Sequence, residues 1–102
     1  ATMSGEMKEF FDRCYYPLLG RIEGRSYMQM ICAGSDGTGA ARQISRIATG
    51  WRLKVAQPPL IVCTNSQTPE SILAPKTIHY ADLDRCHEAG EAIATGLSLG
   101  IF

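Results

Sequence analysis

The sequence lacks net charge, because its 10 Lys and Arg residues balance its 10 Asp and Glu residues. A basic surface for nucleic acid or acidic lipid is therefore not expected. It also lacks a run of about 18 apolar residues that would span a bilayer, and it does not open on the basic and then apolar segments of a signal peptide. These absences predict a soluble, cytoplasmic protein with neither nucleic acid nor membrane among its partners.

Paired cysteine motifs are missing as well, since there is no C-x-x-C and no spacing typical of a zinc site. Three of the four cysteines lie in apolar runs, which predicts buried, reduced thiols and no disulfide framework. A metal held by His79, Cys86 and His87 is a weak alternative, because adjacent residues on a helix point about 100° apart. The four cysteines are Cys14, Cys32, Cys63 and Cys86.

No acid–base pair and no nucleophile beside a base stands out in the sequence. Residues 96–100 match the G-x-S-x-G elbow of hydrolases letter for letter. That elbow needs a strand before it, a helix after it, and acid and histidine partners downstream, which the sequence does not supply. Any enzymatic activity is therefore expected to depend on a cofactor.

Length and composition predict one α/β domain over residues 1–102. The chain is 45% apolar and 20% charged, close to the globular average, and its 102 residues are the size of one domain. Ser4 is the expected N-cap of a helix over about 4–16 that ends near Pro17. Residues 27–33 form a nearly continuous apolar run, which predicts a parallel strand buried on both faces.

The second half of the sequence predicts two helices and one more strand. Thr38 is the expected N-cap of a helix that ends at Gly50, and residues 59–63 form the second strand. Residues 64–80 predict a long irregular connection, after which Asp82 is the expected N-cap of the last helix. The order helix, strand, helix, strand, helix predicts a parallel sheet.

A glycine-rich turn, Gly34-x-x-Gly37-x-Gly39, separates the first strand from the helix after it. In this context backbone N–H groups are free to meet an anion or the polar edge of a ring. The order differs from the dinucleotide fingerprint G-x-G-x-x-G. The carboxylate of Asp36 within the turn would repel a phosphate, so the turn favours an uncharged part of a ligand. A tight strand-to-helix turn without a ligand is the alternative.

Charge is unevenly distributed, because no acid occurs between Asp36 and Glu70. The simplest interpretation of that stretch is a solvated basic face. The alternative is that Arg42 and Arg46 meet a phosphate of a nicotinamide dinucleotide. The basic residues are Arg42, Arg46, Arg52 and Lys54.

Residues 2–13, Thr-Met-Ser-Gly-Glu-Met-Lys-Glu-Phe-Phe-Asp-Arg, resemble the loop-to-helix signature of flavodoxin-like proteins. The similarity is to the branch of NAD(P)H-dependent FMN reductases that includes quinone reductases. Residues 35–40 follow the apolar run 27–33 in the place of a flavin-contacting loop of that family. Residues 89–94 resemble its terminal helix, so the resemblance extends over essentially the whole chain.

The resemblance implies a flavodoxin-like doubly wound parallel sheet that binds FMN and uses NAD(P)H as cosubstrate. Electrons would pass from NAD(P)H through FMN to a quinone or another acceptor. Members of the family cradle the flavin ring largely with backbone atoms of two segments, and no catalytic side chain is implied. In this sequence the implied FMN-binding residues are Ala1, Thr2, Met3, Ser4, Ser35, Asp36, Gly37, Thr38, Gly39 and Ala40.

The chain departs from the family in size, because a five-stranded fold needs about 150 residues and only two strands are convincing here. We therefore expect an incomplete domain, equivalent to the C-terminal half of the family fold, that binds flavin weakly. It is expected to associate, through residues 27–33 or the first helix, with another copy or with the missing N-terminal half. The alternative function is a non-catalytic interaction or assembly module without flavin.

Overall fold

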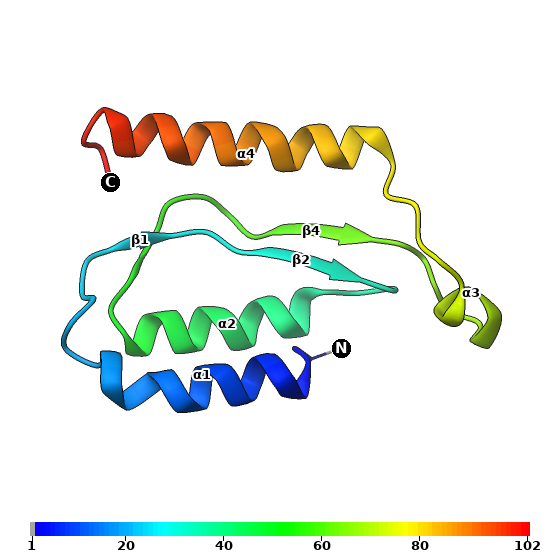
Figure 1. Cartoon of the computed structure of the whole chain (residues 1–102), viewed down its shortest axis with the longest axis horizontal. Helices are drawn as coiled ribbons and strands as arrows, with labels where there is room; N and C mark the ends of the chain where they lie inside the picture. Colours follow the sequence, from blue (N-terminus) through cyan, green and yellow to red (C-terminus); the bar gives the residue numbers. More distant parts are fainter. Residues whose placement is uncertain (1) are drawn as a thin grey trace.

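The computed structural model describes residues 2–102 and has the predicted α/β composition. Three layers are present: α4 lies on one side of the strands, and α1 and α2 lie together on the other (Figure 1). In chain order the elements are α1 (Gly5–Leu18), β1 (Ser26–Tyr27), β2 (Met30–Ala33), α2 (Thr38–Gly50), β3 (Lys54–Val55), β4 (Leu60–Cys63), α3 (Pro69–Leu73) and α4 (Tyr80–Ser98).

The predicted single strand over 27–33 is wrong, because the structure divides it into two short strands. β1 pairs in parallel with β3, and β2 pairs in parallel with β4. Tyr27 lies opposite Val55, 28 residues further on, whereas Met30 lies opposite Leu60, 30 residues further on. The second chain segment therefore holds two additional residues between its strands. Residues 56–59 include two prolines, which have no N–H to continue the ladder.

Gln29 marks the same interruption on the first segment. Its side chain is buried and turned toward α2, where Nε2 donates to the Ala41 carbonyl at 3.2 Å and to Ser45 Oγ at 2.9 Å. Its Oε1 is buried and has no hydrogen-bond partner among the described residues. A buried amide at this point explains why an otherwise apolar run does not stay one regular strand.

Each face of the β2–β4 pair has its own small core. On one face, Leu60 and Val62 pack against Ala89 of α4. On the other, the short side chains of Ala40, Ala41 and Ala48 let α2 approach the strands closely.

α1 is anchored to the end of α2 by aromatic contacts. Trp51 is only 5% exposed, its Nε1–H donates to the Tyr15 carbonyl at 2.8 Å, and its ring stacks on that of Tyr15 with centroids 5.6 Å apart. Phe11 packs against the same indole. These contacts hold α1 beside α2.

Ser4 is confirmed as the N-cap of α1, since its Oγ accepts from the Met7 N–H at 3.1 Å. The helix continues one residue past Pro17 to Leu18, because a proline in the last turn removes only one hydrogen bond. Thr38 is not an N-cap: Gly37 occupies that position, and Thr38 is the first helical residue.

The predicted N-cap at Asp82 is also wrong, because α4 begins earlier. His79 caps it, with Nδ1 accepting from the Ala81 N–H at 3.2 Å, and Asp82 lies in the first turn. The predicted irregular connection over 64–80 contains α3. Thr68 and Ser71 form a capping box around Pro69, which is enough to start this single turn of helix.

The prediction of buried cysteines is wrong for Cys32 and Cys63, which are exposed, while Cys14 and Cys86 are partly buried. All four are free thiols. Burial was expected from the apolar neighbours of these residues along the chain. β2 and β4 are instead covered incompletely, so apolar positions on them remain open to solvent.

The molecule is thin and exposes more surface than its mass requires. Its dimensions are 44 × 30 × 17 Å, and its radius of gyration of 15.4 Å exceeds the roughly 13 Å of a compact chain of this length. Its accessible surface of 7258 Å² exceeds by about 1,600 Å² the value expected for a folded monomer of 11.1 kDa. Within residues 2–102, no helix has the length and apolar character needed to cross a membrane.

Candidate functional site

A cleft of about 340 Å³ lies where the first turns of α1 and α2 meet the carboxyl end of β2. We call it the helix-end cleft. It brings together two segments that are distant in sequence but were both predicted to bind a ligand. Its lining residues are Thr2, Met3, Ser4, Met7, Met30, Ile31, Cys32, Ala33, Gly34, Asp36, Gly37, Ala40 and Ile44.

Six of the ten predicted site residues line this cleft. Ala1 lies outside the described residues. Ser35, Thr38 and Gly39 belong to the turn and the first turn of α2 but do not line the cleft. The six that do are Thr2, Met3, Ser4, Asp36, Gly37 and Ala40.

The chain holds the two segments together through a side chain that the sequence analysis missed. Gln43 of α2 accepts the Met3 N–H on Oε1 at 2.8 Å, a contact that joins residues 40 positions apart. The Met3 amide is therefore used by the fold itself. Gln43 is a polar residue beside the apolar face of α2, and nothing in its spacing marks it as a contact to residue 3.

The turn between β2 and α2 fits tightly onto the strands. A Cβ atom at Gly37 would lie 2.9 Å from Cγ2 of both Ile31 and Ile61, so only glycine allows this approach. A Cβ at Gly34 would lie 3.0 Å from the Ser66 carbonyl oxygen. The Ser66 N–H donates to the Gly34 carbonyl at 2.8 Å, which ties this turn to the segment after β4.

That segment is a second part of the site that sequence reasoning missed. Thr64 Oγ1 and Ser66 Oγ lie 2.9 Å apart, and Asn65 between them has a φ of 56°. Thr64 and Ser66 line a neighbouring hollow of about 290 Å³ together with Lys76. Because carboxyl ends of parallel strands lie at one edge of a sheet, the position of residues 64–66 after the second strand was the available signal.

Asp36 carries the only charge among the side chains that line the helix-end cleft. Its Oδ1 accepts the Thr38 N–H at 2.9 Å. Hydrogen bonds from the Thr38 backbone and hydroxyl, with a smaller contribution from Arg42, lower the pKa of Asp36 from its usual value. The carboxylate is thus ionised near neutral pH at the N-terminal end of α2, where it stabilises the helix and repels anions.

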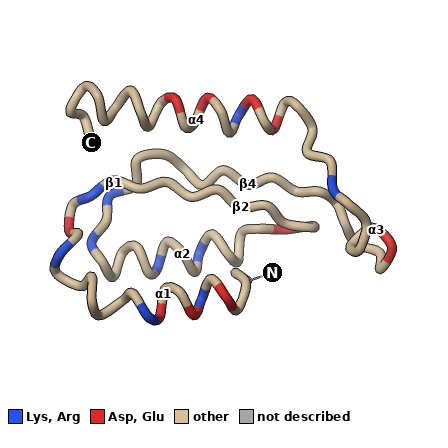
Figure 2. Tube along the Cα trace, viewed as in Figure 1, with Lys and Arg blue, Asp and Glu red and all other residues tan. Residues whose placement is uncertain are grey.

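Arg42 and Arg46 are exposed on α2 and do not line the cleft. Basic positions are the only charged ones on this helix, whereas α1 and α4 carry both signs (Figure 2). The charge of Arg42 makes only the smallest contribution to the lowered pKa of Asp36. The cleft proper therefore suits the uncharged part of a ligand, with positive charge outside it.

Other candidate groups have structural partners. His87 Nε2 pairs with Glu91 Oε1 at 2.9 Å, and in the part of the chain that the structure covers no three His, Cys, Asp or Glu side chains gather as metal ligands would. The G-x-S-x-G stretch forms the end of α4. There Gly100 has a φ of 72° and the Ile101 N–H donates to the Gly96 carbonyl at 2.9 Å. This is a helix C-terminus and not a nucleophile elbow.

Comparison with protein families, with curated proteins and with solved structures found no match to this chain. The coarse fold class, α/β with parallel strands, rests on the structure. The function has to be argued from the helix-end cleft and from the exposed surfaces.

Proposed function

We propose that this chain is an FMN-binding flavoprotein domain of the flavodoxin-like, NAD(P)H-dependent oxidoreductase type. The proposal is supported by one observation above all: residues 2–4 and the turn before α2 line a single cleft at the carboxyl end of parallel strands. Ligands of open α/β sheets bind at this end of the strands. The similarity of residues 2–13 and 35–40 to flavin-contacting segments points to the same place.

The residues of the helix-end cleft fit a planar, mostly uncharged ring. Met7, Met30 and Ile44 offer apolar walls, while Gly34 and Gly37 have no side chain to keep a ring from the backbone. The N–H groups in the first turn of α2 have no partner within the helix, and the Thr38 N–H is already taken by Asp36. The open donors of that turn suit the polar edge of a flavin.

The chain's own groups would hold and orient the ring. Backbone atoms of residues 2–4 would face one side of it, and the turn at Gly37 would face the other. Asp36 repels a phosphate, so the ribityl phosphate would point out of the cleft into solvent. When bound, FMN accepts a hydride from NAD(P)H and passes the electrons on to a quinone or another acceptor.

The test compares FMN with riboflavin by quenching of flavin fluorescence. Only the 18 or so non-hydrogen atoms of the ring are held, so at about 0.3 kcal/mol per atom the expected Kd is about 0.1 mM. Because no basic side chain lines the cleft, the two Kd values should agree within about twofold. Absence of quenching at millimolar protein would contradict flavin binding, whereas a strong preference for FMN would contradict the expectation that the phosphate makes no contact with the cleft.

Met7 supplies the matched pair of variants. It is 45% exposed on α1, so Met7→Glu is tolerated by the fold while it places a charge in an apolar wall. Binding of riboflavin should weaken about tenfold in Met7→Glu and remain within twofold in Met7→Leu. Equal binding by both variants would show that flavin binds elsewhere.

A second candidate function is an interaction or assembly module without flavin. It is favoured by the exposed apolar side chains of α1 and β2, Met7, Phe10 and Met30 among them. The surplus of accessible surface points the same way. A chain that shows no flavin binding yet binds a partner would satisfy this candidate alone.

A further inference from the structure

Beside the helix-end cleft lies the hollow of about 290 Å³ that Thr64, Ser66 and Lys76 line in part. We call it the Lys76 hollow. It shares with the cleft the wall formed by residues 32–34, at the carboxyl end of β2. The two cavities are therefore neighbours at one edge of the sheet, and a single ligand can reach into both.

The two cavities differ in the sign of their charge. The only charged side chain that lines the helix-end cleft is Asp36, whereas the only one that lines the hollow is Lys76. None of the ion pairs within residues 2–102 includes Lys76. An anionic group that Asp36 repels from the cleft is therefore attracted to the hollow next to it.

Lys76 is exposed, yet the main chain holds its ammonium group in place. Nζ donates to the Ile72 carbonyl at 2.6 Å and to the Ala74 carbonyl at 2.7 Å. An ammonium group has three N–H donors, so one is left for a ligand. A side chain that is already held in this way loses less conformational freedom on binding than a free lysine does.

Two hydroxyl groups stand in the same hollow. Thr64 Oγ1 and Ser66 Oγ lie 2.9 Å apart, so one hydroxyl hydrogen lies between them. Thr64 Oγ1 is 3.4 Å from the Ala33 carbonyl oxygen, which is long for a hydrogen bond from a hydroxyl. The second hydroxyl hydrogen is thus free to turn to a stronger acceptor. A cation with neighbouring hydroxyl donors suits an oxyanion, because hydrogen bonds to ionised groups are the strong ones.

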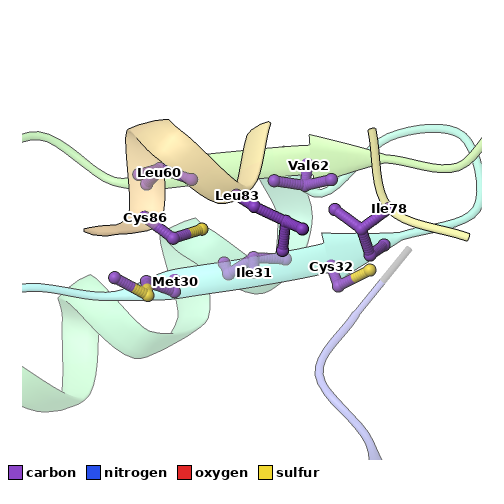
Figure 3. Close-up of a pocket in the computed structure, with 8 residues that line it drawn as sticks. All are labelled: Met30, Ile31, Cys32, Leu60, Val62, Ile78, Leu83 and Cys86. Carbon is purple, nitrogen blue, oxygen red and sulfur yellow. The ribbon is translucent and has the colours of Figure 1, made fainter. Parts of the chain in front are cut away.

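A third cavity reaches Cys32 from the other face of β2 and has a different character. It is a pocket of about 200 Å³ that lies beneath Leu83 and Cys86 of α4 (Figure 3). All of its lining side chains are hydrocarbon or sulfur-bearing, so it offers an anion no oxygen or nitrogen donor. The groups suited to an anion at this end of β2 belong to the Lys76 hollow.

We propose that the Lys76 hollow binds the carboxylate of an aromatic ligand whose ring lies toward the helix-end cleft. The carboxylate accepts from Lys76 and from the hydroxyl pair, and the ring faces the wall of residues 32–34. With flavin in the cleft, this ligand is the electron acceptor, an aromatic or quinonoid carboxylate. That role rests on the proposed function, whereas binding of the carboxylate does not.

The test titrates the whole chain with benzoate in the absence of flavin, at constant ionic strength, and follows backbone amides by NMR. Benzamide is the control ligand, because it has the same ring and a neutral group in place of the carboxylate. Lys76→Met removes the ammonium group and keeps the aliphatic stem. Lys54→Met removes the same charge from an exposed position on β3, and Thr64→Val removes one hydroxyl.

We expect benzoate to shift the amides of Thr64, Ser66 and Gly34 with a Kd of about 10 mM, as for a ligand of this size, and benzamide to bind at least tenfold more weakly. Lys76→Met should weaken benzoate about tenfold, and Thr64→Val about threefold. Lys54→Met should stay within twofold of the unmodified chain. If Lys76→Met disturbs the fold, Thr64→Val decides.

Equal binding of benzoate and benzamide, or equal losses in Lys76→Met and Lys54→Met, overturns the proposal. So does the absence of saturable shifts at these residues. FMN carries an anion as well, so its affinity is measured in the same variants. An FMN affinity that Lys76→Met leaves unchanged supports the assignment of the hollow to the acceptor, whereas a tenfold loss would make it the phosphate site and overturn that assignment. Since the benzoate titration contains no flavin, its failure is distinct from a failure of flavin binding.

Discussion

Replacing Gly37 by alanine tests whether the turn before α2 is held by its close approach to the strands. Gly37 is buried and has a φ of −100°, which alanine adopts without strain. The added Cβ would lie 2.9 Å from Cγ2 of both Ile31 and Ile61, and 3.5 Å from Cβ of Ala33. Two branched side chains on neighbouring strands cannot both withdraw, so the turn itself has to move.

The expected cost is that of overpacking, about 1–3 kcal/mol of unfolding free energy. Loss of a favourable N-cap glycine acts in the same direction. For a domain of this size each kcal/mol lowers Tm by about 4–8 °C, so Gly37→Ala should lower Tm by about 5–20 °C. Because the turn lines the helix-end cleft, riboflavin binding should weaken as well.

Gly90 offers the matched control within the same chain. It lies in the middle of α4, and a Cβ there meets nothing within 4 Å. The same change, Gly90→Ala, should stabilise the chain by about 0.5–1 kcal/mol through helix propensity. Urea and thermal unfolding measure both variants. Effects of the same sign in both would refute the packing argument for Gly37.

Three further predictions concern other contacts. Trp51→Phe removes the partly buried hydrogen bond to the Tyr15 carbonyl, so urea denaturation should show a loss of about 0.5–1.5 kcal/mol. The pKa of Asp36 is lower in the folded state than in the unfolded state, so the Asp36 carboxylate stabilises the fold above the unfolded-state pKa, and this stabilisation is lost as the pH falls through the folded-state pKa. In Asp36→Asn, Tm measured between about pH 2 and 5 should therefore vary less with pH than in the unmodified chain. Gly96→Ala places a Cβ against the ring of Phe102, so the ring resonances of Phe102 should shift in NMR spectra and Tm should fall. An unchanged urea midpoint, an unchanged pH profile or unshifted resonances would contradict these three in turn.

The long helices were predictable because their signals are local. The Ser4 cap and the apolar spacing after it define α1, and the spacing of alanine and isoleucine defines α2. The division of residues 26–33 into two strands was not predictable in this way. It depends on the hydrogen bonds that the Gln29 side chain makes to α2 and on the two prolines between β3 and β4. Both are tertiary interactions, which the local sequence does not reveal.

The convergence of residues 2–4 with the turn before α2 follows from topology, because a helix that precedes a parallel strand begins at that strand's carboxyl end. The groups that fix the distance between them do not follow from it. Gln43 reaches the Met3 N–H only because α1 and α2 lie side by side, and that arrangement depends on Trp51 packing against Tyr15. Such contacts between distant segments leave no pattern in either segment alone.

The wrong prediction for Cys32 has a physical meaning of its own. An apolar run predicts burial on the assumption that strands on both sides and helices on both faces are present. For Cys32 the β4 side and the α2 side are present, while the other edge is open and α4 packs mainly over Leu60 and Val62. The apolar composition of β2 predicts a strand covered on both sides, and Cys32 is exposed because the described residues cover it on one side only.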